Sequence, residues 1–143
     1  MTDLVSPFVL EYAYKRTLGP VLTRFFTALR DGRLQGVATA DGRVLLPPTE
    51  YDPLTGADVG DPVDVGPEGT VATWTWVDDP SPRDPLDTPF AWALIRVDGA
   101  DTDLLHVVDA PRDALKSGVR VRLRWRDERV GTMRDIEAWE IVG

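Results

Sequence analysis

The sequence contains no cysteine and a single histidine, His106. Without cysteine the chain cannot form a disulfide, a thiolate zinc site or a cysteine nucleophile. A histidine-based metal site is disfavoured as well, because zinc needs several protein ligands and one imidazole supplies only one of them. We therefore expect no bound metal and no cofactor.

Long apolar runs and an excess of positive charge are also missing. No stretch approaches the roughly 20 apolar residues that span a bilayer, and residues 1–4 lack the basic and apolar regions of a signal peptide. The formal net charge is −8, which disfavours nucleic acids and anionic membranes as partners, because both attract Lys and Arg. We expect a soluble, cytoplasmic protein that binds neither.

The chain divides into two parts, residues 1–66 and residues 67–143. The stretch 56–69 is rich in Gly, Pro and Asp, and Gly60-Asp61-Pro62 and Gly66-Pro67 are strong breakers of regular structure. The total length fits one domain, or one domain with a small appendage, and it is long enough to bury a core.

The first part predicts one helix followed by a hairpin. Pro20 suits a first helical position and Gly32 suits a C-terminal stop. Short strands are expected over 34–37 and 43–46, joined by the turn signal Asp41-Gly42. The apolar residues at helical spacing are Val21, Leu22, Phe25, Phe26 and Leu29.

The second part predicts five strands, over the ranges 70–77, 89–97, 103–108, 118–126 and 133–142. A helical turn is expected between the third and the fourth strand, over 110–116. Five strands with a short helix between the third and the fourth fit an OB-type barrel, a partly open Greek-key design. The predicted fold class is therefore mainly β, a five-stranded OB-fold barrel preceded by an N-terminal helix and a hairpin.

The predicted strand 118–126 places four arginines on one face: Arg120, Arg122, Arg124 and Arg126. Guanidinium groups match phosphate oxygens, so Arg122 and Arg124 are candidate phosphate ligands. The alternative is a ladder of charge pairs: if Arg126 faces Met133 across the last hairpin, Arg124 faces Asp135 and Arg122 faces Glu137. Each such pair contributes ~0.2–1 kcal/mol. We favour the charged, solvated face.

Aromatic residues and His106 have two interpretations each. Trp74, Trp76 and Trp92 could stack nucleic-acid bases, but the negative charge favours packing in the core or against a protein partner. His106 lies in an apolar strand and could act as a general base. Because no Ser or Cys nucleophile stands beside it in sequence, we favour a structural or interface histidine and assign no catalytic residue.

Residues 38–56 carry a recognisable framework: Gly42, Pro47, Pro48, Pro53 and Gly56. Their spacing resembles the zinc ribbon of the OB-fold acyl-CoA-associated family known as domain of unknown function 35. Members of that family have an N-terminal helix, a rubredoxin-like ribbon and then an OB barrel. The resemblance extends from Pro20 to Trp139.

The resemblance equates the four zinc-binding cysteines of the family with Ala38, Asp41, Asp52 and Thr55. None of these supplies a thiolate, and the two aspartates are too few for a zinc site. The resemblance therefore implies a degenerate, zinc-free ribbon. We expect its loop to be held by its prolines and by packing of Tyr51.

Members of the family accompany thiolases, ketosynthase-like enzymes or thiolase-fold aldolases, and the sequence resembles in particular the subunits paired with steroid side-chain aldolases. The resemblance implies a non-catalytic accessory subunit in a hetero-oligomer with a thiolase-like aldolase or thiolase, which meets the acyl-CoA substrate only indirectly. The reaction class would include retro-aldol cleavage of a steroid side chain. The alternative is a free-standing acyl-CoA-binding protein, and the chain could be a fragment of a longer fusion protein.

Two sets of residues are candidates for the site. Aromatic clusters are typical of interfaces, and those expected to bind the partner are Phe8, Tyr12, Tyr14, Phe25 and Phe26. Packing on the chain's own hairpin is the alternative for this set. The residues expected to contact the substrate channel or acyl-CoA are Phe90, Trp92, Leu94, His106, Arg122 and Arg124.

Overall fold

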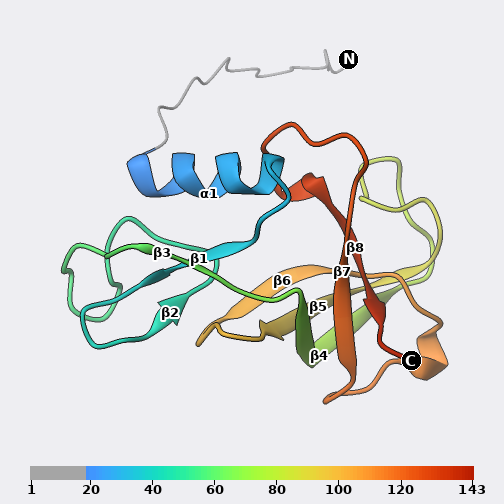
Figure 1. Cartoon of the computed structure of the whole chain (residues 1–143). Helices are drawn as coiled ribbons and strands as arrows, with labels where there is room; N and C mark the ends of the chain where they lie inside the picture. The colour runs from blue at the N-terminus through green and yellow to red at the C-terminus, as the bar shows by residue number, and fades with distance from the viewer. Residues whose placement is uncertain (1–18) are drawn as a thin grey trace, which may run out of the picture.

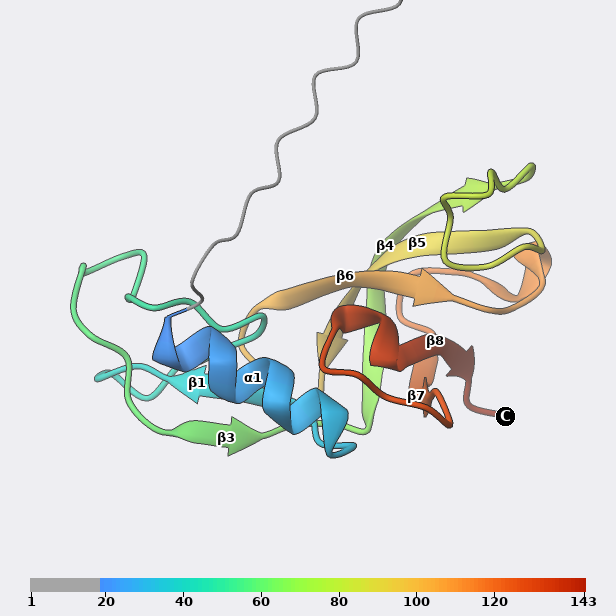
Figure 2. The ribbon, with the colours of Figure 1, turned by 90° about the horizontal axis from the view of Figure 1, so that it is seen from above.

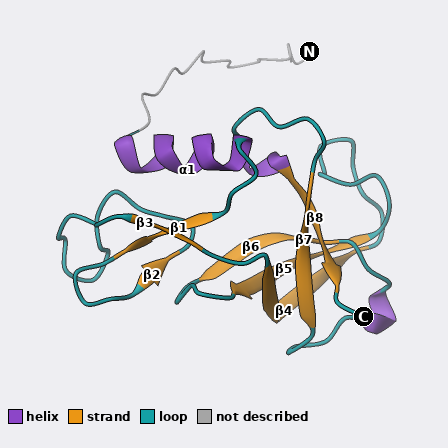
Figure 3. Ribbon diagram, viewed as in Figure 1, coloured by secondary structure: helices purple, strands orange, loops and turns teal. Residues whose placement is uncertain are grey.

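The computed structural model describes residues 19–143, and its elements are drawn in Figures 1 and 3. In chain order they are α1 (Pro20–Arg30), β1 (Gln35–Ala38), β2 (Val44–Leu45), β3 (Pro62–Asp64), β4 (Glu68–Val77), β5 (Phe90–Val97), β6 (Asp103–Val108), the short 3-10 helix η1 (Arg112–Ala114), β7 (Arg120–Trp125), the 3-10 helix η2 (Met133–Asp135) and β8 (Ile136–Ile141). No helix in the described part of the chain is long and apolar enough to cross a lipid bilayer.

Strands β4 to β8 close into a barrel in the order β4-β5-β6-β8-β7, which confirms the predicted five-stranded OB fold. All pairings are antiparallel except that of β6 with β8, which is parallel and confined to Val108 and Trp139. Every second residue of β5 points into the barrel, namely Ala91, Ala93, Ile95 and Val97, each at most 1% exposed. Because β8 pairs with β6 only at Val108, one edge of β6 has little pairing along most of its length.

A bulge between Val71 and Thr73 bends the long strand β4. The bend lets β4 pair with β5 along its whole length and with β7 at its beginning, which closes the barrel. Gly118 precedes β7 with a φ of +92°, a left-handed conformation that glycine adopts without strain.

The residues before the barrel form a three-stranded sheet in the order β2-β1-β3. The sequence predicted β1 and β2 but not β3, because residues 62–64 lie in the stretch read as breakers. Pro62 is the first residue of β3, a short strand at the edge of the sheet, and this is a position where proline is tolerated. β3 pairs with β1 in antiparallel orientation, and Val63 stands opposite Gly36.

Helix α1 lies over the small sheet and reaches η2 at its C-terminal end (Figure 2). It confirms the predicted helix, and Gly32 follows it with a φ of +74°. Its buried residues Phe25 and Leu29 belong to the same hydrophobic cluster as the barrel residues Val71 and Trp139. The helix and the barrel therefore share one core.

The small sheet is joined to the barrel through the free edge of β2. The amide of Val44 donates to the Asp101 carboxylate, and the amide of Asp101 donates to the Val44 carbonyl, both at 2.8 Å. Leu46 exchanges two hydrogen bonds with the Thr102 hydroxyl, at 2.7 and 2.8 Å. The turn between β5 and β6 therefore acts as an extra pairing partner for the small sheet.

Candidate functional site

The outer face of β5 and β6 is apolar and partly exposed. Trp92 stands opposite Val107, and Leu94 stands opposite Leu105. Leu94 and Leu105 are 36% and 58% exposed, and the informative feature is that these two apolar side chains are neighbours. Two strands thus present neighbouring leucines to solvent on one side of the barrel.

Phe90 is fully buried and does not belong to this exposed face. It packs edge-to-face on Trp92, with ring centroids 5.8 Å apart, and forms a small second core with Val107 and Ala138. Leu86, in the segment between β4 and β5, packs against the same core. The expectation that Phe90 contacts substrate is therefore corrected: this segment and Trp92 shield it.

His106 points to the other side of the sheet from Trp92 and Leu94, because it pairs in register with Ala93. It is 7% exposed, and its Nε2 lies 3.3 Å from the Met133 carbonyl oxygen. Burial lowers the pKa of His106, with a smaller opposing effect of the Met133 carbonyl. The neutral ring then donates from Nε2 to this carbonyl and ties β6 to η2. Because His106 lies on the opposite side of the sheet from Trp92 and Leu94, the apolar residues expected to contact substrate do not form a single face.

A pocket of about 290 Å³ lies where β6 faces the start of β8. The segment 78–89 between β4 and β5 forms one wall, and the segment 126–135 between β7 and β8 forms another. OB folds bind their ligands at the corresponding strands and loops. Of the expected site residues, Trp92 and His106 line this pocket, whereas Phe90 and Leu94 do not. Sequence reasoning assigned none of the other lining residues to the site, among them the three arginines Arg83, Arg126 and Arg134.

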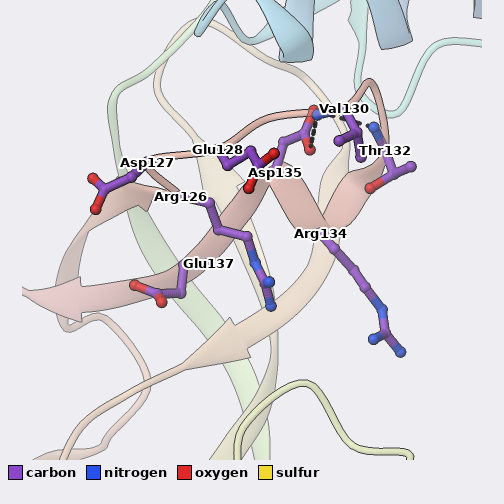
Figure 4. Close-up of a pocket in the computed structure, with 8 residues that line it drawn as sticks. All are labelled: Arg126, Asp127, Glu128, Val130, Thr132, Arg134, Asp135 and Glu137. Carbon is purple, nitrogen blue, oxygen red and sulfur yellow. Dashed lines mark hydrogen bonds between the residues drawn. The ribbon is translucent and has the colours of Figure 1, made fainter.

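The segment 126–135 is held by the buried carboxylate of Asp135. It accepts hydrogen bonds from the backbone amides of Val130, Gly131 and Thr132, at 2.9, 2.7 and 3.1 Å. Figure 4 shows this loop, with Arg126 and Arg134 extending away from the amides that Asp135 binds. The loop is thus a fixed support for both arginines.

The arginine stripe on β7 is mainly neutralised within the chain. Arg124 contacts Glu137 and Glu140 at 2.6 Å and Asp109 at 3.1 Å. These carboxylates, Glu140 most strongly, raise the pKa of Arg124. Arg124 is therefore occupied and is a poor phosphate ligand, whereas Arg122 is exposed.

The register predicted for this stripe is wrong. Arg124 stands opposite Ala138 and Arg122 opposite Glu140, not opposite Asp135 and Glu137. The reason is that residues 133–135 form η2 instead of strand, and a bulge between Arg124 and Trp125 shifts the pairing again.

The proposed partner-binding aromatics fall into two groups. Phe8, Tyr12 and Tyr14 lie outside the described residues. Phe25 is 3% exposed and sits in the shared core, so its assignment to a partner surface is corrected: the apolar face of α1 packs on its own chain. Phe26 is half-buried against the edge of the Phe25 ring, with centroids 5.3 Å apart.

Two of the four positions that the resemblance equates with cysteines, Asp41 and Asp52, are bridged by Arg43. Arg43 Nε contacts both carboxylate oxygens of Asp41 at 3.0 Å, and its Nη2 contacts the buried Asp52 at 2.6 Å. The pKa of Asp52 is lowered mainly by the amide of Leu54, with a further contribution from Arg43.

This cluster does not fit zinc, because a guanidinium joins the two aspartates and no thiolate or imidazole stands with them. Within residues 19–143 no group of three or more acidic or histidine side chains is arranged for a metal ion. Tyr51 is 60% exposed, so the expectation that its packing holds the loop is corrected.

Comparison with known proteins places the fold. Two solved structures resemble the chain at 19% identity: a protein of unknown function from the DUF35 family of Sulfolobus solfataricus, with a TM-score of 0.65 over 87% of both chains, and the Ltp2–ChsH2(DUF35) aldolase, with a TM-score of 0.64 over 89% of this chain and 97% of that one. No curated protein matches the sequence. A family model described as ChsH2, C-terminal OB-fold domain, matches residues 54–126. Because this match covers just over half of the sequence, the chain belongs to the ChsH2 C-terminal OB-fold family.

Proposed function

We propose that this chain is a non-catalytic accessory subunit of a thiolase-like enzyme that acts on acyl-CoA. Its membership of the ChsH2 OB-fold family carries the proposal. The structural similarity to the Ltp2–ChsH2(DUF35) aldolase points in the same direction and makes a thiolase-like aldolase the first partner to test. Retro-aldol cleavage of a steroid side chain is the reaction we propose for the complex.

The outer face of β5 and β6 is the surface we propose for covering the partner's substrate channel. Leu94 and Leu105 expose apolar area next to each other, and Trp92 continues this face toward the pocket. Apolar area that a barrel leaves in water is stabilised when a partner covers it. A cover of this kind would also exclude water from the reacting acyl group.

The N-terminal residues Phe8, Tyr12 and Tyr14 remain part of the proposal as an additional docking segment, together with Phe26. Aromatic side chains of this kind are enriched at protein interfaces. The chain itself contributes no catalytic residue in this proposal. His106 supports this assignment because it is buried and already hydrogen-bonded to the Met133 carbonyl.

The test is co-expression with the thiolase-fold protein encoded nearest to this chain in its genome, followed by size-exclusion chromatography and assay on hydroxyacyl-CoA esters. We expect a stable complex that is active, and a partner that is inactive or insoluble alone. Replacing Leu105 by Asp should weaken the complex by about tenfold or more, since a charge would be buried against apolar area. Leu54→Asp is the matched control, because Leu54 is 77% exposed and lies in the small N-terminal part.

Two results would contradict the proposal. One is equal turnover by the partner alone and by the mixture. The other is the absence of any complex at micromolar concentrations of both proteins. A steroid side-chain ester that reacts no faster than a short linear ester would refute only the substrate assignment.

A further inference from the structure

We propose that the pocket between β6 and the start of β8 binds a small amphipathic anion, a molecule with an apolar chain and a carboxylate or phosphate group. The site is built entirely by this chain and needs no residue of a partner. The inference therefore goes beyond the accessory role and can fail or succeed independently of it.

Three arginines at this pocket make the case for an anion. Arg83, Arg126 and Arg134 all line it. The ion pairs of residues 19–143 are formed by other cations, namely Arg30, Arg33, Arg43, Arg96, Arg120 and Arg124. In a chain with a net charge of −8, three unpaired guanidiniums gathered at one pocket are an anion-attracting feature.

The arginines come from two loops that contact each other. Arg83 belongs to the segment between β4 and β5, whereas Arg126 and Arg134 flank the loop between β7 and β8. Arg134 donates to the carbonyl of Arg83 at 3.5 Å, which brings the two walls together. The single carboxylate at the pocket, Glu137, is held at 2.6 Å by Arg124 and is neutralised there.

The body of the pocket calls for an apolar group. Its remaining walls are mostly apolar: Pro85, Trp92, Leu105, Val107, Met133 and Ile136. A volume of about 290 Å³ is at the lower end for small-molecule sites, so the ligand, or the part of it that enters, is small. An apolar pocket with a few convergent polar groups is the usual form of such sites.

Two buried polar atoms at the pocket lack a partner within the described residues. They are Nε of Arg126 and Nδ1 of His106. His106 is more than nine-tenths buried, and burial of a polar atom without a hydrogen bond is costly. Both atoms have almost no exposed surface, so they mark an incompletely satisfied polar region beside the pocket and are not themselves ligand contacts.

The experiment is isothermal titration calorimetry of the full chain with octanoate, octyl phosphate and octanol. We expect both anions to bind. Octanol should bind at least about tenfold more weakly than either anion, because a charge-assisted hydrogen bond is lost. The ratio of the octanoate and octyl phosphate affinities distinguishes a carboxylate site from a phosphate site.

Substitutions identify the binding groups. Arg134→Met and Arg83→Met, both at exposed positions, should each weaken anion binding several-fold and leave octanol binding within about twofold. Arg112→Met is the matched control: this exposed arginine of η1 does not line the pocket, and its loss should leave binding of all three ligands unchanged. Trp92→Ala should weaken the binding of all three ligands, because Trp92 forms part of the apolar wall.

The proposal is overturned if neither anion binds at millimolar concentration. It is also overturned if Arg83→Met and Arg134→Met bind anions as tightly as Arg112→Met does. Equal binding of octanol and octanoate would identify an apolar pocket without anion recognition and would refute the assignment.

Discussion

At the scale of single residues, His106 is a histidine whose buried surroundings disfavour the protonated ring. It is buried in β6, and burial lowers the pKa of its ring. The unfolded chain accepts a proton near the ordinary value of 6.5, whereas the folded chain accepts it only at lower pH. The folded state is therefore favoured above that value and loses stability as the pH falls through it.

We predict that the free energy of unfolding falls as the pH drops below about 6.5, with a slope of at most about 1.4 kcal/mol per pH unit from this one group. His106→Gln should remove this part of the slope. Urea unfolding at a series of pH values measures it. An unchanged slope in the variant would mean that the ring is no harder to protonate in the folded chain than in the unfolded one.

Arginines illustrate what sequence could and could not predict at this scale. The alternation on β7 correctly gave a charged face, and Arg124 indeed lies among carboxylates. Arg126 belongs to the same alternating series, but it follows the end of the strand and turns to the pocket. Arg83 lies in a Pro- and Asp-rich segment whose path no periodicity specifies.

At the scale of elements, the two loops of the small sheet are held by charge. Arg43 contacts Asp41 in its own turn and Asp52 in the next loop. Asp52 is only 3% exposed, so its carboxylate depends on these partners. The sequence itself shows that the cysteine ligands of the family are missing here. It could not predict that Arg43 would pair with Asp52, because a contact between residues nine apart depends on the folded path of both loops.

We predict that Arg43→Met lowers the melting temperature more than Arg33→Met does. Arg43 partners a buried carboxylate, whereas the ion pair of Arg33 with Asp64 is exposed on both sides and contributes little. Thermal unfolding followed by circular dichroism compares the two variants at neutral pH. Equal shifts would show that the Arg43 contacts stabilise no more than a surface ion pair.

Strand prediction succeeded for the barrel and for the hairpin of β1 and β2, and it failed for β3. The predicted strand 103–108 agrees with β6 to the residue, and the other barrel strands differ only at their ends, except that η2 replaces the first three residues of the last one. β3 has three residues and begins with proline, so only its pairing with β1 makes it a strand. The same dependence on pairing explains the register error at the last hairpin.

At the scale of the whole molecule, the sequence predicts a division into two parts at residues 66 and 67. We propose that these parts, 1–66 and 67–143, form one folding unit. Leu46 of the first part is fully buried, and it belongs to the same cluster as Val97 and Leu104 of the second. Sequence reasoning could place the breakers between the parts, but it could not predict a core shared across them.

We predict that Leu46→Ala destabilises the whole chain by about 2–5 kcal/mol, as expected for a fully buried leucine. Leu54→Ala, at an exposed position, should change stability by less than about 0.5 kcal/mol. Urea unfolding monitored by tryptophan fluorescence, which reports on the barrel, measures both. Two separate transitions, with the barrel unaffected by Leu46→Ala, would contradict a single folding unit.

The bonds that join β2 to the turn after β5 also set an order of events during synthesis. Val44 and Leu46 pair with Asp101 and Thr102, 57 and 56 residues further along the chain. Closing loops of this length costs entropy before any contact compensates for it. The small sheet leaves the ribosome first, yet it acquires its edge partner only after the first barrel hairpin has emerged. The small sheet is therefore expected to complete its pairing only after the first barrel hairpin is made, although its own residues are made first.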